Sequence, residues 1–308
     1  MKKLLMTLAL SATSFIYANV NAVVSILPQQ TFLKKIGGDK VNITLMVQPG
    51  NSPHSYEPKP SQMKEISKAD IYFSLGVEFE HVWLEKFTNQ NKSMIVRSMS
   101  DNITRIKMMK HSHGEEEHGH DDHDEHNHAD HDHDAHEHDD HDEHDHDGKK
   151  DPHIWTTPSN VKVMAQNIYN VLSLMDRENE AYYKKNLATF LAEIENTDKT
   201  IKKLLANIPT HSRFMVFHPA WGYFAKEYHL EQIAIESGGK NPKPKQIAHL
   251  IDEAKEEKVR AVFTAPEFST KVAEQIAKEV GIPVIKVSPL NPKWSENLIN
   301  LAKTIANK

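Results

Sequence analysis

The 308-residue sequence contains no cysteine. Disulfide bonds and thiolate metal ligands are therefore excluded, and no cysteine is available for a lipid anchor. After the N-terminal segment, no stretch approaches the ~20 consecutive apolar residues that a membrane-spanning helix needs. The HExxH pattern of zinc metalloproteases is also missing. These absences argue against membrane insertion and leave histidine and the carboxylates as the strongest available metal ligands.

The chain begins MKKLLMTLALSATSFIYANVNA. Lys2 and Lys3 form a basic start, Leu4–Ala12 is a short apolar segment, and Ala18 and Ala22 are candidate cleavage sites. This pattern predicts a secretory signal peptide over residues 1–18, since the apolar segment is too short to span a membrane. We therefore expect a soluble, exported protein, with the bacterial periplasm as its compartment because a free binding protein would be retained there.

Fourteen of the 21 histidines and 17 acidic residues lie in one segment, His111–Asp147, which holds no lysine or arginine. Almost nothing in it can be buried, so we expect a disordered insert. The bland interpretation is a solvated low-complexity segment, but dense alternation of acid and imidazole favours weak binding of metal at many sites. The candidate ligands in this insert are His111, His113, His118, His120, His123, His126, His128, His131, His133, His136, His138, His141, His144 and His146.

The formal net charge of −6 reflects the insert. Without its 17 acids the chain has a net charge of +11, and loss of Lys2 and Lys3 leaves about +9. The remaining lysines are scattered over predicted helices rather than clustered. Together with the export signal, this argues against nucleic-acid binding.

Strand-like and helix-like segments alternate on both sides of the insert, which is typical of parallel α/β layers. Ser159 is a plausible N-terminal cap of a helix that ends at Met175. A long pattern without proline or glycine follows and predicts a stiff linking helix of about 43 Å. We expect an N-terminal α/β lobe over 22–177 that includes the insert 111–147, a linking helix over 178–207 and a C-terminal α/β lobe over 208–308. The predicted strands are Ala22–Leu27, Val41–Val47, Ile71–Leu75, Ser93–Ser98, Phe214–Phe217, Gln232–Ile235, Ala261–Thr264 and Val284–Val287.

Three of the seven remaining histidines occupy similar contexts. His54 lies in a loop after a predicted strand, His153 follows Pro152, and His218 precedes Pro219 at the end of another strand. Ligands of open α/β sheets bind beyond the carboxyl ends of the strands. The three imidazoles could therefore meet between the lobes, two from the first and one from the second, although their spacing matches no local zinc motif and ordinary loop histidines fit equally well. The other four, His81, His211, His229 and His249, are interpreted as surface or packing residues.

Several motifs spread over the chain resemble those of one known family: PGNSPHSYEPKPSQM, DPHIWTTP, FHPAWGYFAKEY and NLATFLAEI. They are similar to the cluster A-I metal-binding proteins of ABC importers, and the acidic His-rich insert is typical of the zinc members. The resemblance covers essentially the whole mature chain. It implies two α/β lobes joined by a rigid helix, a metal in the cleft between them, and His54, His153 and His218 as its ligands.

One departure from the family pattern concerns the fourth ligand. Where the family often has aspartate in a late DPL motif, this chain has Ser288 in VSPL, and Ala265 stands where an acid is frequent, followed by Glu267. Serine is a poor metal ligand at neutral pH. The fourth position is expected to be taken by water, then by a histidine of the insert, then by Glu267.

Imidazole-rich sites suit zinc, whereas manganese prefers carboxylate oxygen, and copper and nickel are compatible with the same ligands. The leading hypothesis is a monomeric periplasmic protein that captures Zn²⁺ and delivers it to the membrane permease of an ABC importer with its cytoplasmic ATPase. The alternatives are a Mn²⁺ or other divalent-metal binder of the same importer class, and a periplasmic zinc storage or chaperone protein. A zinc hydrolase is disfavoured, because no general base stands beside the three histidines. Glu80, Trp155 and Trp221 are expected to serve packing and hydrogen bonding.

Overall fold

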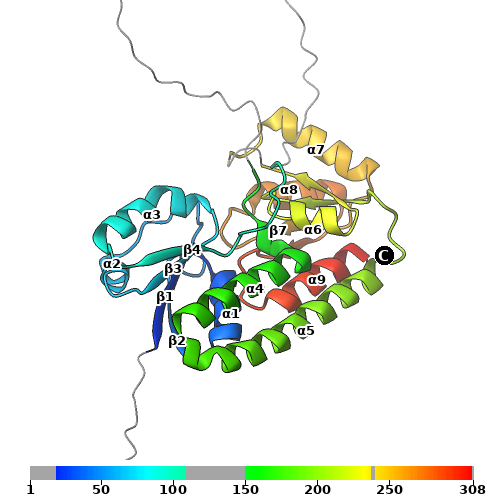
Figure 1. Ribbon diagram of the computed structural model, residues 1–308. Helices are drawn as coiled ribbons and strands as arrows, with labels where there is room; N and C mark the ends of the chain where they lie inside the picture. Colours follow the sequence, from blue (N-terminus) through cyan, green and yellow to red (C-terminus); the bar gives the residue numbers. More distant parts are fainter. Residues whose placement is uncertain (1–18, 109–149, 237–239, 307–308) are drawn as a thin grey trace, which may run out of the picture. The chain divides into compact units, whose positions relative to one another are not determined.

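The structure is a computed structural model that describes residues 19–108, 150–236 and 240–306. The expected signal peptide and the insert 111–147 lie outside these residues. The described chain forms two compact α/β units (Figure 1). The first consists of residues 19–101, 162–194 and 292–294, and the second of 102–108, 150–161, 195–236, 240–291 and 295–306.

The first unit contains a four-stranded parallel sheet in the order β2-β1-β3-β4. Its strands are short β-branched and aromatic runs, as expected for a buried parallel sheet. Helix α1 contributes Phe32, whose ring lies 5.6 Å from that of Phe190 and 5.7 Å from that of Trp294. The elements are β1 (Val20–Val24), α1 (Leu27–Gly37), β2 (Val41–Leu45), α2 (Pro60–Ile66), β3 (Ile71–Ser74), α3 (Glu78–Gln90) and β4 (Ile95–Ser98).

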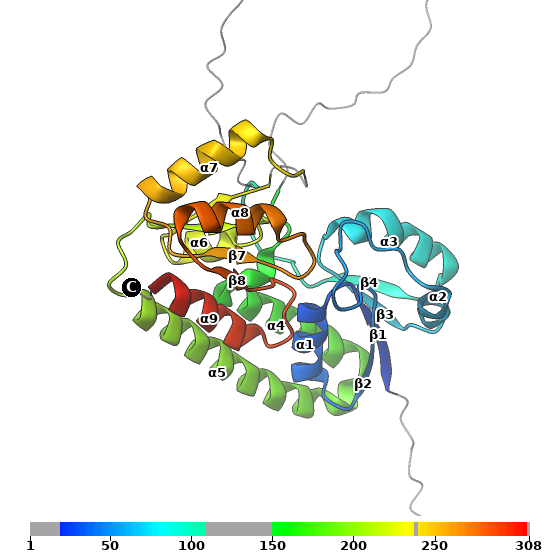
Figure 2. The same cartoon turned by 180° about the vertical axis from the view of Figure 1, so that it is seen from behind.

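The second unit repeats this design with a parallel sheet in the order β6-β5-β7-β8. Strands β7 and β8 of this sheet are labelled in Figure 2. Side chains of successive strand residues alternate between the two faces. Accordingly, Phe214 contacts Phe224 of α6, whereas Met215 belongs to the core formed with α7 and α8. The elements are β5 (Arg213–Val216), α6 (Gly222–Glu227), β6 (Glu231–Ala234), α7 (Pro244–Glu256), β7 (Val262–Thr264), α8 (Lys271–Val280), β8 (Val284–Lys286) and α9 (Trp294–Ala306).

Two long helices belong to both units. Helix α4 (Pro158–Met175) and helix α5 (Glu180–Leu205) each begin in one unit and end in the other, with a 3₁₀ turn at Arg177–Asn179 between them. The long linking helix expected from the sequence is thus present. Ser159 is not the N-terminal cap of α4, because that helix already begins at Pro158. The Ser159 hydroxyl instead donates a hydrogen bond to the Glu227 carboxylate over 2.5 Å. Proline suits the first helical position, because an amide hydrogen has no partner there.

The unit boundary differs from the expected one at residue 177. Residues 102–108 and 150–161 pack with the second unit, so His153 belongs there and not to the N-terminal lobe. The chain is held there by Tyr223 of α6, whose hydroxyl donates to the Asp151 carbonyl and accepts from the Ile106 amide. The residues that make these contacts are far apart in the sequence, so the periodicity of the sequence does not reveal which unit this segment joins.

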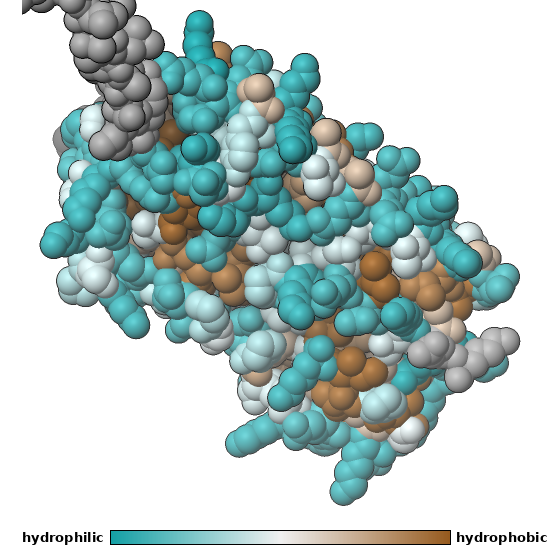
Figure 3. Space-filling view, turned by 90° about the horizontal axis from the view of Figure 1, so that it is seen from below, coloured by the Kyte–Doolittle hydropathy of each residue, from teal (hydrophilic) through white to brown (hydrophobic). Residues whose placement is uncertain are grey.

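On the face shown in Figure 3, hydrophilic residues predominate. Hydrophobic residues appear in separate patches on the face shown in Figure 3. Among the described residues, the exposed large hydrophobic side chains are Val82 and Leu174, at 57% and 70% exposure. No helix within the described ranges combines the length and the apolar character needed to cross a membrane.

Candidate metal centre

The second unit brings two of the predicted histidines into direct contact. The Nε2 atoms of His153 and His218 lie 3.2 Å apart, and the ring centroids are 5.0 Å apart at an angle of 78°. Two nitrogens bound at ~2.0–2.1 Å to one tetrahedral zinc ion are about 3.3–3.4 Å apart. The observed separation therefore suits two ligands of a single ion.

His153 is positioned by the residue two places before it. The Asp151 carboxylate accepts a hydrogen bond from the His153 backbone amide over 2.8 Å, and it lies 2.8 Å from Nδ1 of the His153 ring. Aspartate favours local turns of this kind. Asp151 is 1% exposed. Burial raises the pKa of the neighbouring Tyr223 to about 12, and the negative charge of Asp151 adds to that shift.

His218 is positioned by the pairing of β5 with β6. Val216 pairs with Ala234, and the amide of Glu236 donates to the Phe217 carbonyl, so residue 236 comes to lie beside residue 218. The Glu236 carboxylate faces Nδ1 of His218 over 2.6 Å. The sequence does not reveal this partner, because it does not show the register that pairs strand residues 18 positions apart.

These contacts decide which ring nitrogen can bind a metal. A carboxylate accepts hydrogen bonds, so a proton on each Nδ1 suits these contacts and leaves Nε2 as the ring nitrogen available to a metal. The two Nε2 atoms face each other at 3.2 Å, a separation that suits one cation bound by both rings. Among the described residues, the only basic side chains that pair with Asp151 and Glu236 are these histidines. Two buried carboxylates beside two imidazole rings favour a divalent cation.

His54 lies in the first unit, in the loop between β2 and α2. Its Nδ1 faces the Glu78 carboxylate over 2.8 Å, the same arrangement as in the other two histidines. The loop is anchored by Gln62, whose side chain binds the Tyr56 hydroxyl and the carbonyls of Leu45 and Met46 at the end of β2. Glu78 begins α3 directly after the β3 edge.

Glu267, a candidate fourth ligand, belongs to no cluster of three metal-ligating side chains within the described residues. Its carboxylate accepts a hydrogen bond from Ser288. The histidines of the insert lie outside the described residues. Lys107 and Lys150 pair in an antiparallel bridge, so the chain leaves for the insert and returns from it close to Asp151.

The other singled-out residues have structural contacts. The Trp155 indole donates a hydrogen bond to the Pro289 carbonyl over 2.8 Å. The backbone amide of the buried Trp221 donates to the side-chain oxygen of Gln232. Glu80 accepts from the Leu75 and Gly76 amides and from Ser25. His81 and His249 are exposed, and His211 binds Glu231 at the surface.

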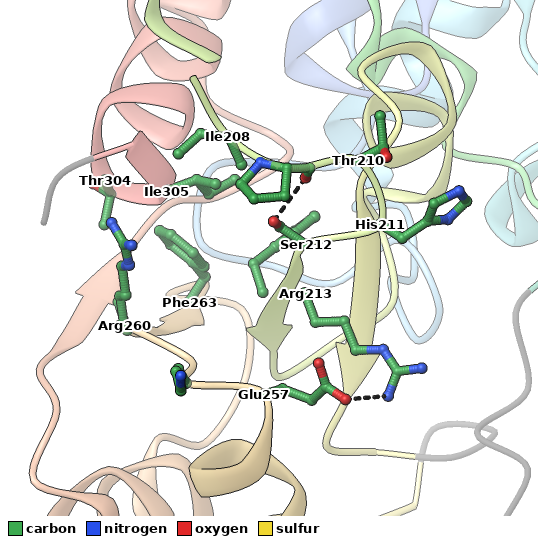
Figure 4. A pocket seen from close by; sticks show the side chains of 14 residues that line it. Ile208, Thr210, His211, Ser212, Arg213, Glu257, Arg260, Phe263, Thr304 and Ile305 are labelled. Carbon is green, nitrogen blue, oxygen red and sulfur yellow. Dashed lines mark hydrogen bonds and ion pairs between the residues drawn. The ribbon is translucent and has the colours of Figure 1, made fainter. Parts of the chain in front are cut away.

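A pocket of about 350 Å³ lies at the opposite end of β5 from His218 (Figure 4). Arg213, Lys258 and Arg260 surround an apolar part that includes Phe263 and Ile305. Arg213 is already paired with Glu231, Glu253 and Glu257. The positive charge of Arg213 is thus neutralised within the protein. The His153–His218 pair is therefore a better candidate ligand site than this pocket.

Comparison with known proteins is consistent with a metal centre. A family model described as "Zinc-uptake complex component A periplasmic" matches residues 22–308. The high-affinity zinc uptake system protein ZnuA of Bacillus subtilis is 30% identical over 85% of this chain and 76% of its own length. The manganese ABC transporter substrate-binding lipoprotein scaA of Streptococcus gordonii is 28% identical over 86% and 77%, respectively. A crystal structure of ZnuA with 38% identity covers 94% of this chain and 98% of its own, with a TM-score of 0.78.

Proposed function

We infer that this chain, which belongs to the ZnuA family of metal-binding components of ABC importers, captures Zn²⁺ and delivers it to a membrane permease. The family consists of substrate-binding proteins and not of enzymes. Membership of this family therefore excludes the zinc hydrolase alternative. Divalent-metal binding is common to zinc and manganese relatives. The choice of zinc is our proposal.

The observation that carries the proposal is the paired Nε2 atoms of His153 and His218. Both rings are oriented at Nδ1 by buried carboxylates, an arrangement that in metal sites fixes the tautomer and strengthens the ligand. Zinc favours imidazole nitrogen, whereas manganese favours carboxylate and water oxygen. A centre led by two such rings therefore supports zinc over manganese.

We propose His54 as the third ligand. Its loop lies at the carboxyl end of β2, the edge where α/β sheets bind ligands, and Glu78 orients its ring as Asp151 and Glu236 orient the other two. Three neutral imidazoles and one further ligand would complete a tetrahedral zinc shell. We propose water for the fourth position, ahead of an insert histidine, because Glu267 is engaged by Ser288.

The insert 111–147 is proposed to collect zinc weakly near this centre. Lys107, which precedes the insert, pairs with Lys150, which follows it, and Asp151 comes next in the chain. A tethered chain raises the local concentration of its ligands near its anchor. The competing storage interpretation would make the insert the functional part and the two units a scaffold.

We propose the periplasm as the compartment, in agreement with the signal-like sequence of residues 1–18 and with the description of the family. The Streptococcus gordonii relative is named a lipoprotein. The partners we propose are the permease and ATPase of an importer.

The test is titration calorimetry of Zn²⁺ into the processed protein and into single and triple His54, His153 and His218→Ala variants. We expect one tight event in the wild type, a strong weakening in each single variant and loss of the event in the triple variant. His81→Ala and His249→Ala serve as controls, one in each unit, and should bind normally. A tight event that survives in a folded triple variant contradicts the proposed site.

A further inference from the structure

Two loops of the second unit bring a serine and a glutamate together at the sheet edge that carries His218. Glu267 follows β7 and Ser288 follows β8, at the same carboxyl edge of the sheet as His218. The Ser288 Oγ lies 2.9 Å and 3.1 Å from the two oxygens of the Glu267 carboxylate. Both residues are half-buried.

Ser288 is held so that its hydroxyl proton points to Glu267. The Leu290 amide donates to the Ser288 Oγ over 3.0 Å and occupies one of its lone pairs. The backbone carbonyl of Ser288 accepts from the Asn291 amide and the Asn297 side chain. A hydroxyl has one hydrogen, so the remaining contact of Oγ is the bond that it donates to the carboxylate.

Neighbours of this pair lie against His218 directly and against His153 through Trp155. Phe268, next to Glu267, stacks on His218 with ring centroids 4.7 Å apart at 21°. Pro289, next to Ser288, accepts the indole hydrogen of Trp155, whose ring lies 5.4 Å from that of His153. The Ser288–Glu267 pair is thus joined to the surroundings of both rings by adjacent residues, yet Glu267 belongs to no cluster of three metal-ligating side chains in the described chain.

We propose that Ser288 is a specificity-determining residue that keeps the Glu267 carboxylate out of the metal's coordination shell. The ion then meets imidazole nitrogens and water, a shell that favours zinc, instead of a shell with a carboxylate, which would admit manganese. This inference rests on the proposed metal site. It concerns only which ions that site accepts.

The test compares Ser288→Ala, Glu267→Gln and the double variant for binding of Zn²⁺ and Mn²⁺. Removing the hydroxyl frees the carboxylate, so Ser288→Ala should bind Mn²⁺ about tenfold more tightly, a change of about 1.4 kcal/mol, with a smaller change for Zn²⁺. Glu267→Gln alone should leave Zn²⁺ binding within about threefold, since the carboxylate is not a ligand in the wild type. The double variant should return to wild-type Mn²⁺ binding.

Ser288→Thr, which keeps the hydroxyl, is the matched control and should behave as the wild type. Visible absorption of the Co²⁺-loaded proteins gives a readout independent of affinity. The spectrum should change in Ser288→Ala, because a carboxylate oxygen enters the shell, and it should revert in the double variant.

Unchanged Mn²⁺ binding and an unchanged Co²⁺ spectrum in a folded Ser288→Ala variant would overturn the inference, and so would strong loss of Zn²⁺ binding in Glu267→Gln. Neither result touches the proposed function, which depends on the tight zinc event and its loss in the histidine variants. Absence of a tight event in the wild type would instead overturn the proposed function.

Discussion

His153 and His218 face each other through their Nε2 atoms at 3.2 Å, and each ring is backed by a buried carboxylate at Nδ1. The carboxylates at Nδ1 leave Nε2 of each ring available to a metal, and the two Nε2 atoms are close enough to bind one cation. This relationship ties the candidate metal site to the packing of the second unit.

Asp151→Asn and Glu236→Gln should each weaken zinc binding about 10- to 100-fold, because the rings lose the partner that fixes their tautomer and orientation. Calorimetry with a competing chelator measures the change. Glu231→Gln is the matched control, since it removes a carboxylate 2.8 Å from the exposed His211. Equal losses in all three variants would show that general charge, and not ring positioning, is responsible.

Gly222→Ala should disturb the candidate metal centre by displacing Asp151, the residue that orients His153. A methyl group at residue 222 would lie 2.7 Å from Asp151 Oδ2 and 3.3 Å from Ile106 Cδ1. Overpacking of this kind costs roughly 1–3 kcal/mol of folding free energy. We expect a lower melting temperature and weaker zinc binding.

The binding defect of Gly222→Ala should be smaller when Asp151 is already Asn, because residues in contact act non-additively. A full additional loss in the double variant would mean that Gly222 acts by another route.

Glu80→Gln should change how stability depends on pH. Burial raises the pKa of the Glu80 carboxyl above its ordinary value, while hydrogen bonds from Ser25, Leu75 and Gly76 partly oppose the shift. Between the unfolded and folded pKa values the native state binds more protons, so its stability falls as pH rises from about 4.5.

The Gln variant has no such titration, and its free energy of unfolding should vary less over pH 4–7. It should also be destabilised by about 1–3 kcal/mol, because its amide group cannot accept all the hydrogen bonds that the carboxylate accepts. Denaturant unfolding across this range measures both effects. Glu65→Gln, at the exposed pair with Lys68, is the control and should keep the wild-type slope.

Signal cleavage is proposed to follow Ala18 and not Ala22. Strand β1 begins at Val20, and Val20, Asn21 and Ala22 pair with Val41, Asn42 and Ile43. Cleavage after Ala22 would remove the start of this strand, and the bonds of Asn19 to Asp39 and Asn42 with it. The intact mass of the exported protein should correspond to an N-terminal Asn19. A mass that begins at Val23 would contradict this.

Deletion of residues 111–147 should leave the tight zinc event intact and remove the weaker equivalents, because the oriented ring nitrogens belong to the described residues. Calorimetry separates the two classes of site. Loss of the tight event would mean that an insert histidine is a primary ligand. Poor growth of the deletion strain in scarce zinc, with tight binding intact, would favour the storage interpretation.

The architecture was largely predictable. Short β-branched runs separated by amphipathic segments indicated parallel α/β layers, and the predicted strand Ala261–Thr264 contains β7 at Val262–Thr264. The predicted strands are displaced by a residue or two, as with β5 at Arg213–Val216. Such displacements arise because hydrogen bonding between strands, which the sequence does not display, sets where a strand ends.

The candidate site was predictable only in part. His153 and His218 stood out because each adjoins proline in a loop. The predicted N-terminal lobe, residues 22–177, included His153, whereas this residue packs with the second unit. Asp151 could have been noticed as an acid two residues before His153. Glu236 could not, since its place beside His218 depends on the β5–β6 register.

By itself the sequence determined the kinds of ligand available, since the absence of cysteine and the distribution of histidine leave imidazole and carboxylate for a transition metal. It also determined the alternating elements that carry them, because periodicity and turn residues act locally. Only the tertiary structure decided which carboxylate orients each ring and that Ser288 engages Glu267. Those choices follow from strand order and loop contacts between residues far apart along the chain.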